Sequence, residues 1–255
     1  KVVKQVCAEL DDSGALPVGV SAPGLAADDD RSIAIMPGRF PGLEGFDWPN
    51  HLGRDAVFVL NDAKAALIAE ANFGAGVNCQ NIVLLTLGTG VGGAIMINGE
   101  LVRGNMNRAG HLGHISLDID GPAGITGIPG SLEFAVGNAT VEERSNGKFH
   151  STAELIEAVN QNDQNAGAIW NLSVRKLAVG VCSIINVISP ELVILGGGIS
   201  QAGETLMEPL SKYMDMYEWR PNGTATPIRI AKFLELSGAI GAAGYAFKKS
   251  TIGSV

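Results

Sequence analysis

Two polar residues, Asn61 and Asp62, stand where a carboxylate can do chemistry. The apolar run at residues 56–60 predicts a buried strand that ends at this pair, and the alanine-rich segment 63–73 predicts a helix that follows it. An ionised carboxylate at the end of a buried strand is costly unless it is paired, hydrogen-bonded or kept for a chemical role, such as accepting a proton from a hydroxyl group. The residues leave one alternative open, in which Asp62 only caps the helix.

The glycine-rich run 88–93 (GTGVGG) fits the pattern G-x-G-x-x-G. In a dinucleotide-binding fold this pattern opens a helix, but here a strand predicted at residues 94–97 follows and ends in the hairpin signal Asn98-Gly99. This context argues against a dinucleotide-binding fold, and a nucleotide-binding oxidoreductase remains only as a weak alternative. Without Cβ atoms, the backbone N–H groups can approach phosphate oxygens, and Thr89 adds a hydroxyl donor. An ordinary tight hairpin remains the alternative for this run taken alone.

A second glycine run, Gly196 to Gly198, follows a strand predicted at residues 192–195 and precedes a helix. Parallel sheets of α/β proteins place their ligands at the carboxyl ends of strands. A flat ring could pack on the bare backbone here. Simple packing of the strand against the helix explains the same glycines.

His111, His114 and Glu133 are further candidate polar residues. The two histidines could ligate a metal, but no cysteine or third histidine lies nearby in the sequence to complete a zinc site. Glu133 stands near the start of a predicted short helix, where an acidic side chain interacts favourably with the helix dipole. Taken alone, these three residues predict no function.

The composition predicts a substantial core. The chain has 255 residues, of which 46% are hydrophobic and 17% charged, enough for one large domain or two lobes. A net charge of −8 offers no basic surface for nucleic acid or anionic membranes. The cysteines, Cys7, Cys79 and Cys182, are too dispersed for a metal site or a disulfide framework, which indicates a reducing cytoplasm. The most apolar stretch, residues 177–188, is too short to span a bilayer.

Strands and helices alternate along the chain, which indicates an α/β fold with a mixed sheet. Ser151 with Glu154 forms a capping box that starts a helix, and a long buried helix is expected at residues 164–188. Strands are predicted at residues 18–20, 33–36, 56–60, 81–87, 94–97, 100–102, 192–195 and 228–231. Other helices are predicted near residue 1, at residues 48–52 after Asp47, at residues 63–73, after residue 198 and from residue 239.

Taken together, these motifs resemble the actin-like, ATP-dependent sugar kinases of the repressor/ORF/kinase (ROK) family. Residues 84–93 (LLTLGTGVGG) are similar to the family's second phosphate loop, and residues 61–66 (NDAKAA) to its N-D-A catalytic motif, in matching order and separation. The resemblance covers nearly the whole chain, because it continues through residues 109–114 (AGHLGH), 130–133 (GSLE), 195–198 (LGGG) and 238–243 (GAIGAA).

The resemblance implies an actin-like ATPase (ribonuclease H-like) fold, with a small lobe at residues 1–61 completed by a C-terminal helix at 239–255, and a large lobe at 62–238. It implies glucokinase-like phosphorylation of a hexose-type sugar by ATP and Mg²⁺, with Asp62 as general base. A cytoplasmic homodimer is the family-level expectation. The implied sugar contacts are Asn61, His111, His114 and Glu133. The implied ATP contacts are Gly88, Thr89, Gly90, Gly92, Gly196, Gly197 and Gly198.

The sequence departs from the family pattern in three places. The family's first phosphate loop, D-x-G-G-T, is absent from the chain given, so we expect preceding residues that supply the first strands of the small lobe and on which activity depends. Gly124, Thr126 and Ser131 replace the three cysteines of the family's zinc motif, so no structural zinc is expected. His111 stands where the family commonly has a glutamate, so the resemblance does not predict which sugar is the substrate.

A sugar-sensing transcriptional regulator or an inactive kinase relative is the alternative function, because the family also contains repressors. Those proteins carry a basic helix-turn-helix before the kinase-like body. This acidic sequence contains no such motif. The presence of Asn61 and Asp62 favours chemistry over sensing.

Overall fold

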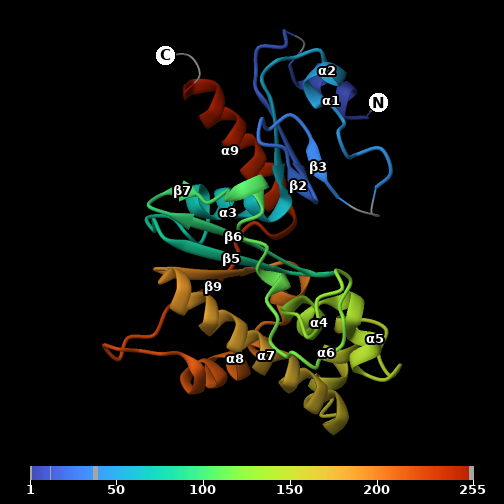
Figure 1. The fold of residues 1–255 in the computed structure, drawn as a ribbon, viewed down its shortest axis with the longest axis vertical. Helices are drawn as coiled ribbons and strands as arrows, with labels where there is room; N and C mark the ends of the chain where they lie inside the picture. Colours follow the sequence, from blue (N-terminus) through green and yellow to red (C-terminus); the bar gives the residue numbers. More distant parts are fainter. Residues whose placement is uncertain (1, 12, 37–39, 253–255) are drawn as a thin grey trace.

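The computed structural model describes residues 2–11, 13–36 and 40–252, and the strands in these ranges form three sheets. The largest sheet lies across the middle of the molecule, in the strand order β7-β6-β5-β8-β9 (Figure 1). Its strands are β5 (Ile82–Leu87), β6 (Val91–Ile97), β7 (Glu100–Leu101), β8 (Leu192–Gly196) and β9 (Ile228–Ile230). β5 pairs antiparallel with β6 and parallel with β8. The predicted mixed sheet is therefore confirmed.

Two smaller sheets lie toward the N-terminus. β1 (Val18–Ala22) pairs in parallel with β4 (Val57–Asn61), and β2 (Leu25–Ala26) pairs antiparallel with β3 (Ile33–Ile35). Both lie on the same side of the large sheet as α9 (Ser237–Ile252) in Figure 1. The sequence analysis did not predict β2, since two residues are too short for a periodic pattern.

Helices cover both faces of the large sheet (Figure 1). α3 (Asp62–Phe73) packs on one face, and α7 (Gln164–Ile188) with α8 (Glu204–Tyr217) on the other. The remaining helices are α1 (Val2–Leu10), α2 (Trp48–Leu52), α4 (Leu132–Val136), α5 (Val141–Arg144) and α6 (Thr152–Asn160). Short 3₁₀ turns occur at η1 (Asn105–Asn107), η2 (Leu112–His114), η3 (Asn138–Thr140), η4 (Gly198–Ala202) and η5 (Leu234–Leu236).

Strand β5 shows why the central strands are apolar along their length. Val83, Leu85 and Leu87 belong to the core that contains α7 and α8, whereas Ile82 and Leu84 belong to the core that contains α3. Successive side chains alternate between the two faces of a strand, and both faces are covered. Because both of its faces are buried, β5 has a fixed position in the sheet beside β8, and so does the edge at which the two strands end.

Glycines bring α9 close to the N-terminal strands and to α3. A Cβ atom at Gly19 of β1 would overlap the carbonyl oxygen of Ala242, and one at Gly241 would overlap that of Ala65. The C-terminal helix therefore packs on both β1 and α3. The lobe boundaries at residues 61/62 and 238/239 stay predictions, and residues 253–255 of the predicted helix lie outside the described residues.

The predicted elements agree with the structure to different degrees. α7 spans residues 164–188 as predicted, and Asp47 and Ser151 cap α2 and α6. β6 begins at Val91 rather than Ala94, because the glycine-containing residues after Val91 continue the ladder with β5. The sequence analysis took the glycines after Val91 as the end of a turn, whereas Gly92 and Gly93 are part of strand β6.

Among the described residues, α7 is the one helix long and apolar enough to cross a membrane by length and composition. In its most apolar window, 56% is buried inside the protein. Its buried side chains include Trp170, Leu177 and Ile184 of the main core. This burial is typical of a core helix.

Candidate active site

Asn61 and Asp62 lie at the junction of β4 and α3. The N-cap of α3 is Asn61 rather than Asp62, because Oδ1 of Asn61 accepts hydrogen bonds from the N–H groups of Ala63 (3.1 Å) and Lys64 (3.2 Å). Nδ2 of Asn61 donates to the carbonyl oxygen of Gly24 at 2.9 Å. This buried side chain therefore fixes the start of the helix, and a direct sugar contact for it stays a prediction. The Asp62 carboxylate stands in the first turn on an exposed residue.

The glycine-rich run forms the turn between β5 and β6. The carbonyl oxygens of Gly88 and Thr89 accept hydrogen bonds from the N–H groups of Asn138 and Ala139, both at 2.9 Å, which ties the turn to η3. The N–H groups of Thr89 and Gly90 have no hydrogen-bond acceptor within the part of the chain that the structure describes. Two neighbouring backbone donors on an open turn can bind phosphate oxygens.

The second glycine turn lies at the same edge of the sheet. β5 and β8 run parallel with Thr86 opposite Gly196, so both strands end there. Gly197 has φ of 83°, and a Cβ atom on it would overlap the carbonyl oxygen of Leu87, so only glycine fits this close approach. Gly196 itself is buried within β8 and does not face open space.

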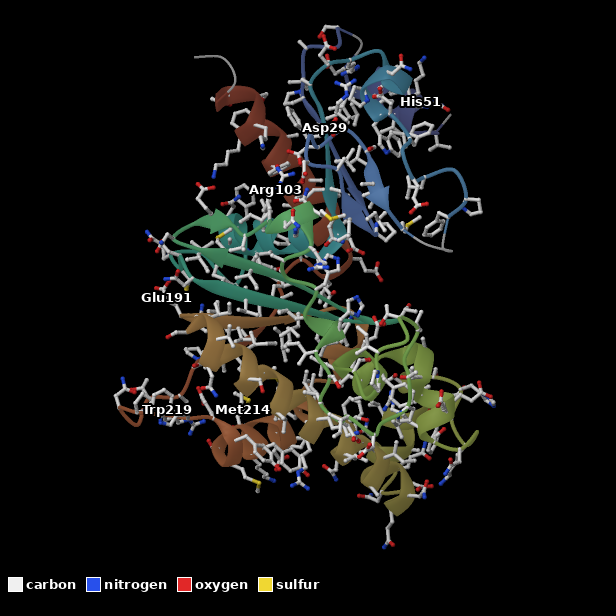
Figure 2. All side chains as sticks on the ribbon, viewed as in Figure 1. Asp29, His51, Arg103, Glu191, Met214 and Trp219 are labelled. Atoms are coloured by element: carbon white, nitrogen blue, oxygen red, sulfur yellow. The ribbon has the colours of Figure 1, made fainter. Side chains whose placement is uncertain are left out.

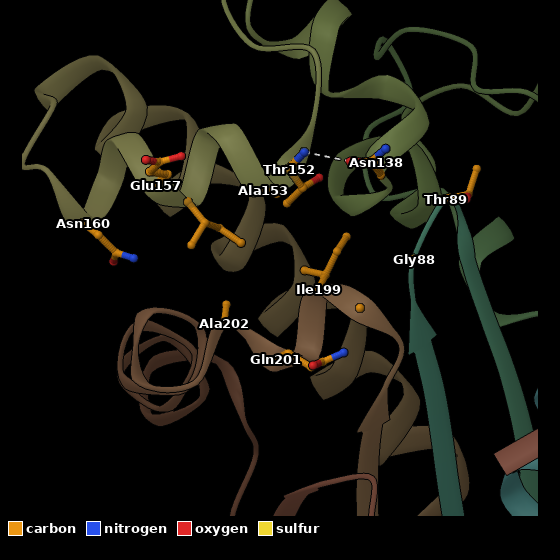
Figure 3. Close-up of a pocket in the computed structure, with 12 residues that line it drawn as sticks. Gly88, Thr89, Asn138, Thr152, Ala153, Glu157, Asn160, Ile199, Gln201 and Ala202 are labelled. Carbon is orange, nitrogen blue, oxygen red and sulfur yellow. Dashed lines mark hydrogen bonds between the residues drawn. The ribbon is translucent and has the colours of Figure 1, made fainter. Parts of the chain in front are cut away.

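A cavity of about 580 Å³ opens beside the two turns (Figure 3). Cβ atoms at Gly88 and Gly198 would meet nothing within 4 Å, so bare backbone faces the cavity. The hydroxyl oxygen of Thr152 is buried and has no hydrogen-bond partner among the described residues. The lining consists of Gly88, Thr89, Asn138, Thr152, Ala153, Ile156, Glu157, Asn160, Gly198, Ile199, Gln201 and Ala202.

The sequence analysis missed the cavity residues on α6 and those on η4 other than Gly198. The capping box at Ser151 predicted where α6 starts but not which surface it faces. Ile156 of α6 and Ile199 of η4 lie far apart in the sequence but line the same cavity, and Figure 3 shows Ile199 there. Such a pairing becomes visible only when the fold is known.

Glu133 holds the glycine-rich turn between β5 and β6 in place. Its Oε2 atom accepts a hydrogen bond from the N–H group of Val91 at 3.1 Å, and a Cβ atom at Gly90 would overlap the same oxygen. Ser131 caps α4 by accepting from the N–H group of Phe134, which places Glu133 in the first helical turn. A sugar contact for Glu133 stays a prediction.

His111 and His114 flank η2, which packs on β6. A Cβ atom at Gly113 would overlap the carbonyl oxygen of Val91, so the turn lies directly on the strand. The two imidazole rings stack with centroids 6.1 Å apart. Nδ1 of His114 is buried without a hydrogen-bond partner in the described ranges, and burial lowers the pKa of His111.

The candidate residues converge on the turn between β5 and β6. A Cβ atom at Gly92 would lie 3.4 Å from Cβ of Ala63, which places the glycine hairpin against the first turn of α3 beside Asp62. Glu133 holds the hairpin from α4, and η2 packs on β6 next to it. The structure therefore gathers two carboxylates, two histidines and the glycine-rich turn, with the cavity of about 580 Å³ alongside.

A protein-family model described as the ROK family matches residues 1–249. The chain belongs to the ROK family. It is 32% identical to a glucokinase of Thermotoga maritima over 94% of this chain and 82% of that one. It is also 37% identical to an N-acetylmannosamine kinase of Vibrio cholerae, over 76% of this chain and 69% of that one.

A solved ROK structure shares the fold. The glucokinase from Streptomyces griseus in complex with glucose and AMPPNP superposes with a TM-score of 0.80, at 26% identity, over 97% of this chain and 88% of that one. The predicted actin-like α/β fold is confirmed by this likeness. The site roles carried over from the family stay predictions for this chain.

The zinc motif of the ROK family is replaced here. Within the described ranges, no group of three or more His, Cys, Asp or Glu side chains could hold a metal ion. Ser131, at one of the replaced positions, caps α4 instead. The expected absence of structural zinc stays a prediction that metal analysis can test.

Proposed function

We propose that this protein transfers the terminal phosphoryl group of ATP to a hydroxyl group of a hexose-type sugar, with Asp62 as general base. The close approach of Gly92 to Ala63 carries the proposal, because it places the glycine-rich turn beside the first turn of the helix that begins with Asp62. The glucokinase and N-acetylmannosamine kinase relatives support the reaction class and the hexose-type substrate.

The cavity suits the nucleotide. The free N–H groups of Thr89 and Gly90 would hold phosphate oxygens, and the backbone of Gly198 with the side chains of Ile156 and Ile199 would pack against a flat base. Mg²⁺ usually keeps several waters and binds phosphates with one or two carboxylates, so it needs no cage of protein ligands. Bound to the phosphates, it would neutralise their charge.

The sugar would lie on the Asp62 side of the hairpin. There Asp62 would accept the proton of the attacking hydroxyl group, and His111, His114 and Glu133 would contact neighbouring hydroxyl groups. A homodimer and a cytoplasmic location belong to the same proposal.

A coupled ADP-release assay on the natural full-length protein tests this function. The sugars are glucose, mannose, fructose, N-acetylglucosamine and N-acetylmannosamine, each with ATP and Mg²⁺. We expect turnover of at least one sugar. Saturable sugar binding without turnover of any of them would support the sugar-sensing alternative, and no sugar binding would contradict both.

A further inference from the structure

A second cavity, of about 270 Å³, lies between α3, α9 and the segment that joins β6 to β7. Its volume is near the lower end of the range for small-molecule sites. Asn72 of α3 lines it and stands ten residues after Asp62, which is about 15 Å along a helix that rises 1.5 Å per residue. None of its lining residues lines the cavity proposed for the nucleotide. It is therefore separate from the proposed active site.

One wall of this second cavity is apolar and lies where two hydrophobic clusters meet. Met96 of β6 belongs to the cluster under the large sheet, and Ile68 of α3 belongs to the cluster beside α9. Leu101 of β7 is partly buried and packs against both clusters. These three side chains, named here the apolar wall, line the cavity and could contact the apolar part of a ligand.

Lys249 of α9 brings to the cavity an ammonium group that has no carboxylate to itself. Its Nζ atom lies 3.2 Å from Oδ2 of the buried Asp30. Both oxygens of that carboxylate already accept hydrogen bonds from Arg103, at 2.6 Å and 3.1 Å. Figure 2 shows Arg103 where α9 approaches the large sheet. Two cations therefore share one carboxylate, and a net positive charge remains at this group.

The other charged residues at the cavity balance each other. Lys248 pairs with Glu100 at 2.9 Å, and both side chains are more than half exposed. Among the described residues that line the cavity, these two and Lys249 are the charged ones. With the adjoining pair of Arg103 and Asp30, the local charge is positive, whereas the whole chain carries −8. The surplus charge beside the apolar wall fits an anion with an apolar body.

We propose that this cavity binds a small organic acid, with its carboxylate against Nζ of Lys249 and its apolar part against the apolar wall. The carboxylate would form a charge-assisted hydrogen bond with an ammonium group that now shares its only acid. An uncharged molecule of the same shape would lack this bond, and inorganic phosphate would lack the apolar contact. The proposed sugar and nucleotide sites take no part in this binding.

NMR titration of the natural full-length protein tests the proposal. The probes are benzoate and hexanoate, with benzyl alcohol and inorganic phosphate for comparison. We expect at least one of the two acids to bind saturably, and about tenfold more tightly than either comparison probe, as the loss of one hydrogen bond to a charged group predicts. No saturable binding of either acid, or equal binding of benzoate and benzyl alcohol, would overturn the proposal.

Variants of α9 locate the binding. A Cβ atom at Gly244 would lie 3.8 Å from Ile68 and Asn72, an ordinary contact distance, so the position accepts a side chain. Gly244→Leu should fill the cavity and weaken acid binding at least about tenfold, whereas Gly244→Ala, the matched control, should keep it.

The charge is tested in the same titration. Lys249→Met should weaken acid binding as much as Gly244→Leu does, and Lys212→Met, at an exposed lysine of α8, should leave it unchanged. Thermal unfolding shows which variants are folded. Acid binding that persists in folded Gly244→Leu and Lys249→Met would place the ligand elsewhere and overturn the proposal. Kinase turnover is not measured in this experiment, so its outcome does not depend on the proposed function.

Discussion

Oε2 of Glu133 lies 3.1 Å from the backbone nitrogen of Val91 and accepts its hydrogen bond. The carboxylate is 8% exposed, so the contact is made away from water. It joins α4 to the first residue of β6, just after the turn that is proposed to hold phosphate. Any side chain that displaces Glu133 should therefore disturb the turn.

Gly90→Ala should lower kcat/KM for ATP by about 10- to 100-fold, through the loss of one or two charge-assisted hydrogen bonds to the phosphates. The added methyl group would overlap Oε2 of Glu133 and push the turn away from its position. Steady-state kinetics with varied ATP measure the effect.

Gly167→Ala is the matched control, because its Cβ atom would meet nothing within 4 Å on helix α7. It should leave kinetics unchanged and raise the unfolding free energy by about 0.5–1 kcal/mol. Equal kinetics in both variants would show that the Glu133 contact does not position the turn.

Thr152→Val should separate nucleotide binding from stability. The Thr152 hydroxyl oxygen is buried at the cavity without a hydrogen-bond partner among the described residues. Removing it should leave the unfolding free energy unchanged or higher by up to about 1 kcal/mol. If the hydroxyl group contacts the nucleotide, the stabilisation by AMPPNP seen in thermal unfolding should become smaller. A variant that is less stable without ligand would argue for a structural role instead.

Lys64 should make stability depend on pH above neutrality. Burial lowers its pKa to about 8, with Arg103 adding to the effect. The unfolded chain keeps this proton up to about pH 10.5, so it binds more protons than the folded chain in this interval and stability rises with pH. Between pH 8 and 10 the gain should be about 2 kcal/mol.

Urea unfolding at a series of pH values measures this dependence. The slope should disappear in Lys64→Met and persist in Lys212→Met, which alters an exposed lysine paired with Glu208. A wild-type slope that remains in Lys64→Met would assign the dependence to another group.

Asp30→Asn should destabilise the protein by about 2–4 kcal/mol, because it leaves the Arg103 charge without its partner. Asp30 also accepts a hydrogen bond from Tyr245 at 2.6 Å and pairs with Lys249, so this one buried carboxylate joins the turn between β2 and β3 to the segment after β7 and to α9. The exposed pair of Lys212 and Glu208 provides the contrast, since Glu208→Gln should lower the unfolding free energy far less than Asp30→Asn does. Similar losses in both variants, measured by urea unfolding, would contradict this account.

The sequence predicted features that depend on local patterns. The 25 residues of α7 follow from a long apolar stretch that ends before Pro190, and each glycine run was predicted to follow a strand, but only the structure shows that the two turns share one edge of the sheet. The role of Asn61 as N-cap was assigned to Asp62 instead, because both side chains suit the position and only the backbone distinguishes them. Contacts between distant segments, such as Glu133 with Val91, left no signal in the sequence.

The most direct measurement of the central claim compares the wild type with Asp62→Asn in the ADP-release assay, using the preferred sugar. Asparagine keeps the size of the side chain but cannot accept the hydroxyl proton. We expect kcat to fall by about 10²- to 10⁴-fold, with sugar Kd changed by less than about threefold. A variant that retains more than a tenth of wild-type kcat would contradict Asp62 as the general base.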